Sequence, residues 1–214
     1  MKIGLLADSA GDIDALDRGT ALLLAHGAER LYFLGGRYPD VDEMLLRRKS
    51  ARRGGREYND ADFLSDVSSF LGKSGGGLEA KLHQRDEDDL LRERFSRVPC
   101  RESLEYREPQ VPNKLVEMMG DVLACLVHDK ADLIKDDMLN AVFLIHGKSP
   151  DPNVVQIGPR FFVTPGRLTG SSEQTCALLE LSGNQIHFDA FTLEGENIKH
   201  LDLTMVRQNK MSAK

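Results

Sequence analysis

The chain has 214 residues, of which 41% are hydrophobic and 29% are charged, and its formal net charge is −6. This composition is typical of one soluble globular domain and excludes a disordered or membrane-embedded chain. The negative balance excludes a global attraction to nucleic acid or anionic lipid, so any such attraction must be local. Three widely spaced cysteines, no recognisable signal peptide and no apolar run of ~20 residues predict a cytoplasmic protein without membrane insertion.

The first 36 residues have the pattern of a strand, a helix and a second strand. Residues 3–7 form a short apolar run that ends at Asp8, and residues 31–34 form another that ends at Gly35-Gly36. Between them, apolar side chains at helical spacing over 13–24 predict a helix, which a glycine closes. Such a unit implies parallel strands joined by a right-handed crossover, and ligands of these sheets gather where the strands end.

The character of the chain changes between residues 47 and 95. A helix predicted over 42–48 runs into a basic stretch over 47–56, and further helices are predicted over 60–71 and 78–95. We therefore expect a helical, partly basic insertion over 47–95, within a single domain that spans 1–214. The apolar face of the helix at 60–71 must be buried, so that this helix either caps a cleft or offers a surface to a partner.

The second half of the chain returns to strands. Two apolar runs, 122–127 and 141–145, end next to histidines, His128 and His146. Four later strands are predicted over 153–157, 160–164, 175–181 and 185–193. The last two are separated by Ser182-Gly183-Asn184, which is typical of an antiparallel hairpin. The sequence thus predicts an α/β protein with a parallel half followed by an antiparallel half.

Polar side chains follow three of these strands, namely Asp8, His128 and His146. Carboxylate and imidazole ligands suit Mn, Fe or Zn, so their convergence at one sheet edge would form a metal site. Simpler interpretations stand beside this one. A histidine after an apolar strand is more often a hydrogen-bonded end residue than a ligand, and Asp8 before a helix is also suited to forming a turn or a helix cap.

The order of these segments resembles the calcineurin-like metallophosphoesterases, in particular the small bacterial phosphodiesterases and the retromer subunit that shares their fold. The matching segments are KIGLLADSAGDIDAL, LYFLGG, LACLVHD, AVFLIHGKSP and FFVTPGRLTG, which occur in the family's order. The resemblance implies a four-layer αββα sandwich of two mixed sheets flanked by helices, here with a helical insertion. It also implies that the ancestral site held two divalent metals such as Mn, Fe or Zn.

The family's metal-binding motifs are degenerate in this chain. The resemblance places seven vestigial metal-site positions at Asp8, Ala10, Gly36, Arg101, His128, His146 and Lys148. Ala10 and Gly36 stand where the family has a histidine and the bridging aspartate, and Arg101 and Lys148 stand where it has asparagine and histidine. Two cations would repel a divalent ion placed between them. We therefore expect no metal cofactor and no catalytic residue, with at most one weakly bound ion at Asp8, His128 and His146.

Fixed cations in a former metal cleft would suit an anion. Lys148, Arg167 and Arg101 are the candidate anion-binding residues, for a phosphate or an acidic side chain. The alternative is that Lys148 and Arg167 are solvated loop residues, or that Lys148 neutralises Asp8. Six cations over 47–56, from Arg47 to Arg56, also suit a nucleic-acid backbone or an acidic partner, although a solvated loop explains them too.

Three hypotheses about function follow from the sequence. The first is a non-catalytic metallophosphoesterase-fold protein, or pseudoenzyme, that serves as a protein-binding, scaffolding or anion-sensing module. The second is a metal-dependent phosphoesterase or phosphodiesterase with a rearranged site at Asp8, His128 and His146. The third, less favoured because few aromatic side chains accompany the basic stretch, is nucleic-acid binding through Arg47 to Arg56.

Overall fold

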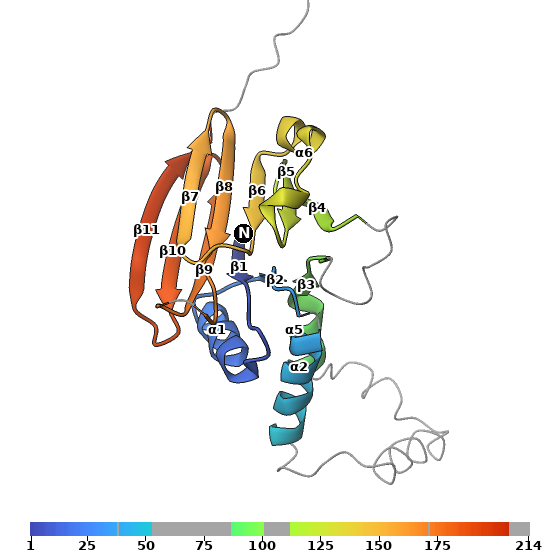
Figure 1. Ribbon diagram of the computed structural model, residues 1–214. Coiled ribbons are helices and arrows are strands. Elements are labelled where there is room, and N and C mark those ends of the chain that lie inside the picture. Colours follow the sequence, from blue (N-terminus) through green and yellow to red (C-terminus); the bar gives the residue numbers. More distant parts are fainter. Residues whose placement is uncertain (38, 53–86, 101–111, 171, 206–214) are drawn as a thin grey trace, which may run out of the picture.

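A computed structural model describes residues 1–37, 39–52, 87–100, 112–170 and 172–205. Two β-sheets pack face to face, and helices cover their outer faces (Figure 1). The predicted four-layer sandwich of two mixed sheets flanked by helices is confirmed. None of the helices in these residues is both long and apolar enough to cross a membrane.

The first sheet has six strands and contains both ends of the described chain. Their order is β11 (Asn197–Thr204), β10 (Gln185–Thr192), β9 (Thr175–Ser182), β1 (Lys2–Leu6), β2 (Arg30–Phe33) and β3 (Phe95–Arg97). Strands β1, β2 and β3 are parallel, as predicted for the first two, and β9 is antiparallel to β1. The predicted hairpin between β9 and β10 is also confirmed, with Ser182 opposite Gln185.

The second sheet has five strands. Their order is β4 (Lys114–Met119), β5 (Val122–Val127), β6 (Phe143–His146), β8 (Arg160–Pro165) and β7 (Pro152–Ile157). Strands β5, β6 and β8 are parallel, whereas β4 and β7 run antiparallel at the two edges. Each sheet is therefore mixed. The expectation of a parallel half followed by an antiparallel half is correct for most pairs, but β4 is antiparallel to β5 in the first half and β8 is parallel to β6 in the second. Hairpins add antiparallel strands to parallel cores in both sheets.

Helices α1 (Ile13–Ala25), α2 (Pro39–Arg52) and α5 (Glu87–Arg94) cover the first sheet. Helix α1 begins where the Asp12 carboxylate accepts a bond of 2.9 Å from the Ala15 N–H, and it is followed by Gly27 at φ +87°. A side-chain cap at the start of a helix and a glycine after its end are common ways of satisfying the unpaired backbone N–H and C=O groups there. A 3-10 turn, η2 (Lys130–Asp132), and the short helix α6 (Lys135–Asn140) cover part of the second sheet.

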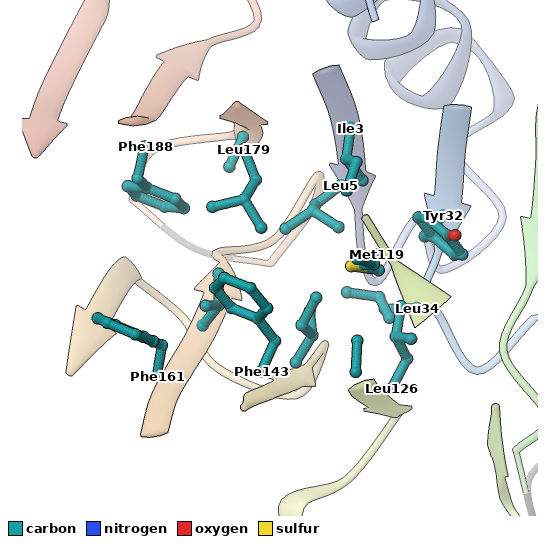
Figure 2. Packing of buried hydrophobic residues seen from close by; sticks show 14 of the residues in the cluster. Ile3, Leu5, Tyr32, Leu34, Met119, Leu126, Phe143, Phe161, Leu179 and Phe188 are labelled. Atoms are coloured by element: carbon teal, nitrogen blue, oxygen red, sulfur yellow. The ribbon is translucent and has the colours of Figure 1, made fainter. Parts of the chain in front are cut away.

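The core lies between the two sheets and is wholly apolar over its centre. Figure 2 shows its largest side chains meeting there, among them Leu5, Tyr32, Leu126, Phe143, Phe161, Leu179 and Phe188. Strand β1 is buried on both faces, because Ile3 and Leu5 enter this core while Leu6 packs beneath the helices. Polar contacts also join the sheets; in one of them, the Tyr32 hydroxyl donates to Glu117 over 2.6 Å.

Several predicted segments differ from the observed ones at their ends. Helix α2 begins at Pro39, three residues earlier than expected, because proline fits the first turn of a helix. The strand expected from residue 141 begins at Phe143. Strands β3, β4 and β11 and helix α6 were not predicted. The expected insertion, 47–95, falls mostly outside the described residues; its described ends belong to α2, α5 and the first residue of β3.

The stacked pair Phe143–Phe161 sits at the centre of the core, with ring centroids 5.5 Å apart. We expect Phe143→Ala to lower the free energy of unfolding by about 3–5 kcal/mol, because a fully buried ring leaves a cavity that its neighbours cannot fill. Urea unfolding followed by circular dichroism measures the loss. Leu46→Ala, at a side chain 65% exposed, is the control and should change it by about 0.5 kcal/mol or less.

Candidate functional site

Five loops meet at one edge of the two sheets, after β1, β2, β5, β6 and β8. Several hydrogen bonds join them. Leu168 N–H donates to Ala7 O (2.9 Å) and Thr169 Oγ1 to Asp8 O (2.8 Å), while His128 Nδ1 donates to Leu34 O (2.7 Å) and Lys148 N–H to His128 O (2.8 Å). The carboxyl ends of parallel strands lie side by side, so the topology itself assembles the residues that follow them. These loops form the candidate site.

The loop after β1 is held by a buried carboxylate, Asp40, from the first turn of α2. Asp40 is 1% exposed and accepts bonds from the Ser9 hydroxyl (2.6 Å), the Gly11 N–H (2.8 Å) and the Arg37 guanidinium (3.2 Å). A buried charge is tolerated only with such partners. The same loop carries Asp8 at φ +49° and Ala10 at φ +48°, a backbone region that side chains other than glycine seldom adopt. Asp40 therefore fixes a strained turn.

The Asp8 carboxylate lies between a cation and an imidazole. Arg167 Nε is 3.1 Å from Asp8 Oδ2, and His128 Nδ1 is 3.7 Å from Asp8 Oδ1. The Arg167 N–H is buried and is not aligned as a hydrogen bond, so the contact is chiefly a charge pair. Because the Leu34 carbonyl can only accept, the His128 nitrogen that faces it carries a proton. The nitrogen of His128 nearest Asp8 thus has no lone pair for a metal.

His146 and Lys148 stand on either side of Gly147 at the end of β6. The Nδ1 atom of His146 is buried without a hydrogen-bond partner, and burial, aided by the charge of Lys130, lowers the pKa of this imidazole. Lys148 Nζ is 3.0 Å from Asp129 Oδ2. Bonds from the Ala131 N–H and then from Lys148 hold the pKa of Asp129 below its ordinary value. The loop is packed so tightly that a Cβ on Gly147 would lie 2.3 Å from the Leu34 carbonyl oxygen.

The structure brings some of the predicted positions together and reassigns others. Asp8 and His128 are neighbours, as expected, whereas Arg101 lies outside the described residues. Arg167 pairs with Asp8, whereas Lys148, for which neutralisation of Asp8 was an alternative, pairs with Asp129. Lys148 turns to Asp129 because both follow neighbouring parallel strands, β6 and β5. Each of the two described candidate anion-binding cations is thereby paired with a carboxylate.

The residues present do not fit the pair of divalent metals that the family resemblance implies. Ala10 and Gly36 offer no side-chain donor, and the Asp8 carboxylate is already neutralised by Arg167. Across the residues that the structure describes, no three His, Cys, Asp or Glu side chains are grouped so as to hold a metal ion. The arrangement offers fixed charges and hydrogen bonds.

The basic stretch begins on α2, not in a loop. Arg47 lies 2.6 Å from Glu43 and 3.5 Å from Asp14, and Arg48 pairs with Asp17 on α1. These acidic partners reduce the local positive charge that a nucleic-acid backbone would meet. Residues 53–56, including Arg56, and the predicted helix over 60–71 lie outside the described residues.

Sequence reasoning missed Asp40 and Arg37, which organise the site. The available signal was an acidic residue in the first turn of a helix, three residues after an arginine. That pattern alone is typical of a solvated helix start. Nothing in the sequence places Ser9 or Gly11, about thirty residues away along the chain, against that carboxylate.

Comparison with solved structures finds similar folds at low sequence identity. A conserved protein of Streptococcus pneumoniae, a predicted phosphoesterase, is 14% identical, with a TM-score of 0.56 over 95% of this chain and 97% of that one. Vps29 from Chaetomium thermophilum is 13% identical, with a TM-score of 0.56 over both whole chains. A double mutant of Vps29 from Entamoeba histolytica is 12% identical, with a TM-score of 0.54 over 95% of this chain and 100% of that one. No protein-family model and no curated protein matches the chain.

Removing the Asp40 carboxylate should expose its role in fixing the loop. We expect Asp40→Ala to lower the free energy of unfolding by about 1–3 kcal/mol for each donor, Ser9 Oγ and Gly11 N–H, left without an acceptor. Chemical unfolding measures the total. The matched control is Asp14→Ala, whose carboxylate is exposed and pairs only with exposed Arg47. An equal, small effect of both substitutions would show that Asp40 does not hold the loop.

Two histidines should titrate on opposite sides of the ordinary value of about 6.5. Burial lowers the pKa of His146, whereas a hydrogen bond and charge from Asp189 raise the pKa of exposed His200. Because its pKa is lowered, His146 decreases the stability of the fold as the pH falls below ~6.5. Because its pKa is raised, His200 stabilises the fold below pH ~6.5, and this stabilisation is lost as the pH rises through the pKa of His200. Imidazole NMR titration, assigned with His146→Gln and His200→Gln, measures both. The reverse order would contradict the geometry.

Proposed function

We propose that this chain, which has the calcineurin-like metallophosphoesterase fold, is a non-catalytic member of that fold that acts by binding a protein partner. The observation that carries the proposal is the ion pair between Asp8 and Arg167. It places a permanent cation against the first carboxylate of the vestigial metal site. An arginine keeps its charge at every pH at which the protein is folded, so this cation cannot be lost by deprotonation.

Family chemistry requires two metals that generate hydroxide and clamp the phosphoryl oxygens. Here Ala10 and Gly36 give no ligand, and a metal at Asp8 would have to displace the Arg167 guanidinium and lie within its field. The two missing ligands and the Asp8–Arg167 pair together favour a site that has exchanged metal ligation for internal charge pairing.

A protein partner is favoured over a free anion. The two described candidate anion-binding cations are neutralised internally, Arg167 by Asp8 and Lys148 by Asp129, so a small anion would have to break an existing pair in order to bind. Fixed pairs of opposite sign instead offer a pattern of charges that a complementary protein surface recognises. Such patterns contribute specificity and association rate more than affinity.

One observation favours a second candidate, a phosphoesterase with a rearranged single-metal site. The buried Nδ1 atom of His146 has no hydrogen-bond partner, and its lowered pKa keeps the ring neutral, which is the form that ligates metals. Asp8 and His128 would supply the other donors. The variants His128→Ala and His146→Ala distinguish the two candidates, because only a phosphoesterase has metal-dependent activity that these substitutions would abolish.

The decisive measurement is metal content with phosphodiesterase activity. We expect full-length protein that is incubated with Mn²⁺ or Zn²⁺ and desalted to retain far less than stoichiometric metal, because Arg167 holds Asp8. We also expect no turnover of bis-p-nitrophenyl phosphate, followed by release of nitrophenol. Near-stoichiometric metal with sustained turnover would overturn the proposal.

A restoration series supplies the control. The triple variant Ala10→His, Gly36→Asp and Arg167→Ser returns two donors and frees Asp8, so it should gain metal, measured by elemental analysis. The same variant with Arg167→Lys keeps a cation beside Asp8 and should gain much less. Equal gains in both would show that the ion pair does not exclude the metal.

A further inference from the structure

The edge strands of the two sheets differ in the number of charged side chains that they carry. In the described part of the chain, the two sheets end in four edge strands: β3, β11, β4 and β7. Three of them carry charged side chains, which discourage pairing with another chain: Arg97 on β3; Lys114 and Glu117 on β4; Lys199, His200 and Asp202 on β11. Strand β7, with the sequence PNVVQI, carries none.

The side chains of β7 alternate between the core and the outer face of the second sheet. Val154 packs against the core between the sheets. Val155, which lies opposite Phe162 of β8, points to the outer face and is 46% exposed, and Ile157 is 60% exposed. Two β-branched apolar side chains are thus left at the outer rim of the sheet, where an added strand would cover them.

Local side-chain bonds identify the backbone groups on the free edge of β7. The Val154 N–H bonds to the Asn153 side chain (2.9 Å) instead of to β8. The Gln156 side chain in turn donates to the Gly158 carbonyl (3.2 Å). Because alternate residues of a strand direct their N–H and C=O groups to opposite edges, Val154, Gln156 and Gly158 face outward and Val155 lies between them.

We propose that β7 pairs antiparallel with β7 of a second copy of this chain, with the two-fold axis at Val155. The two Val155 residues then form a non-hydrogen-bonded pair, and Val154 of each copy exchanges backbone hydrogen bonds with Gln156 of the other. Asn153 of one copy lies opposite Ile157 of its partner. The second sheet of each molecule thereby continues into a ten-stranded sheet.

The sequence of β7 suits this self-pairing. A two-fold axis brings identical segments together, so any charge near the centre would meet its own copy, and β7 has no charge to do so. Lys199 Nζ binds the Pro152 carbonyl (3.3 Å) and the Asn153 amide oxygen (2.8 Å), which marks where the pairing must stop. Pairing over Asn153–Ile157 is short and buries less than a standard interface of roughly 1,600 Å². The dimer is therefore weak and depends on concentration.

Cysteine cross-linking tests the register directly. Paired residues without hydrogen bonds have Cα atoms about 4.5 Å apart, within the range that a disulfide spans. We expect Val155→Cys in the full chain to form a covalent dimer under mild oxidation, seen on a non-reducing gel. Val116→Cys is the matched control: it is also 46% exposed, on the other edge strand of the same sheet, and should remain monomeric. The native cysteines, all buried, do not compete.

Sedimentation velocity over a concentration series provides the second measurement. The unmodified chain and Val116→Lys should shift from monomer to dimer as concentration rises, whereas Val155→Lys should remain monomeric because two ammonium groups would meet at the axis. Circular dichroism verifies that all variants are folded. A monomer at every concentration, equal cross-linking of both cysteine variants, or dimerisation unchanged by Val155→Lys would each overturn the proposal.

Discussion

The buried carboxylate of Asp40 is the constraint on which the site depends. A loop that holds Asp8 and Ala10 at positive φ is costly, and it persists because Asp40 binds the Ser9 hydroxyl and the Gly11 N–H at once. Arg37 balances the charge of Asp40 from the side of the loop. The conformation of the β1–α1 turn is therefore set by a helix that comes later in the chain, and the direction of the Asp8 carboxylate follows from it.

Close backbone packing then brings the remaining loops to Asp8. Gly147 approaches the Leu34 carbonyl so closely that no larger residue fits, and this contact holds the loops after β2 and β6 together across the two sheets. The His128 ring bonds to the same carbonyl, while Thr169 bonds to the backbone of Asp8. Hydrogen bonds and close backbone packing thus join the five loops at this edge of the sheets.

The carboxylates where these five loops meet are balanced by the side chains of arginine and lysine. Arg167 lies against Asp8, and Lys148 lies against Asp129, so each described cation is neutralised where it stands. An ion pair that is partly sheltered from water resists screening by salt better than an exposed one. Charge also distinguishes the edge strands of the sheets. Among the described edge strands, β7 alone has no charged residue to prevent another strand from pairing with it.

The sequence by itself determined the strand–helix–strand start and the β9–β10 hairpin, because short apolar runs and a glycine turn are local features. The sandwich architecture was expected from the resemblance of the ordered segments to the metallophosphoesterase family. It also placed Asp8 and His128 together, although they follow strands of different sheets, β1 and β5. Only the tertiary structure assigned Arg167 rather than Lys148 to Asp8, and identified Asp40 as the residue that holds the loop. Those partners lie tens to more than a hundred residues apart, and a charge pair has no periodicity or spacing that a chain could display before it folds.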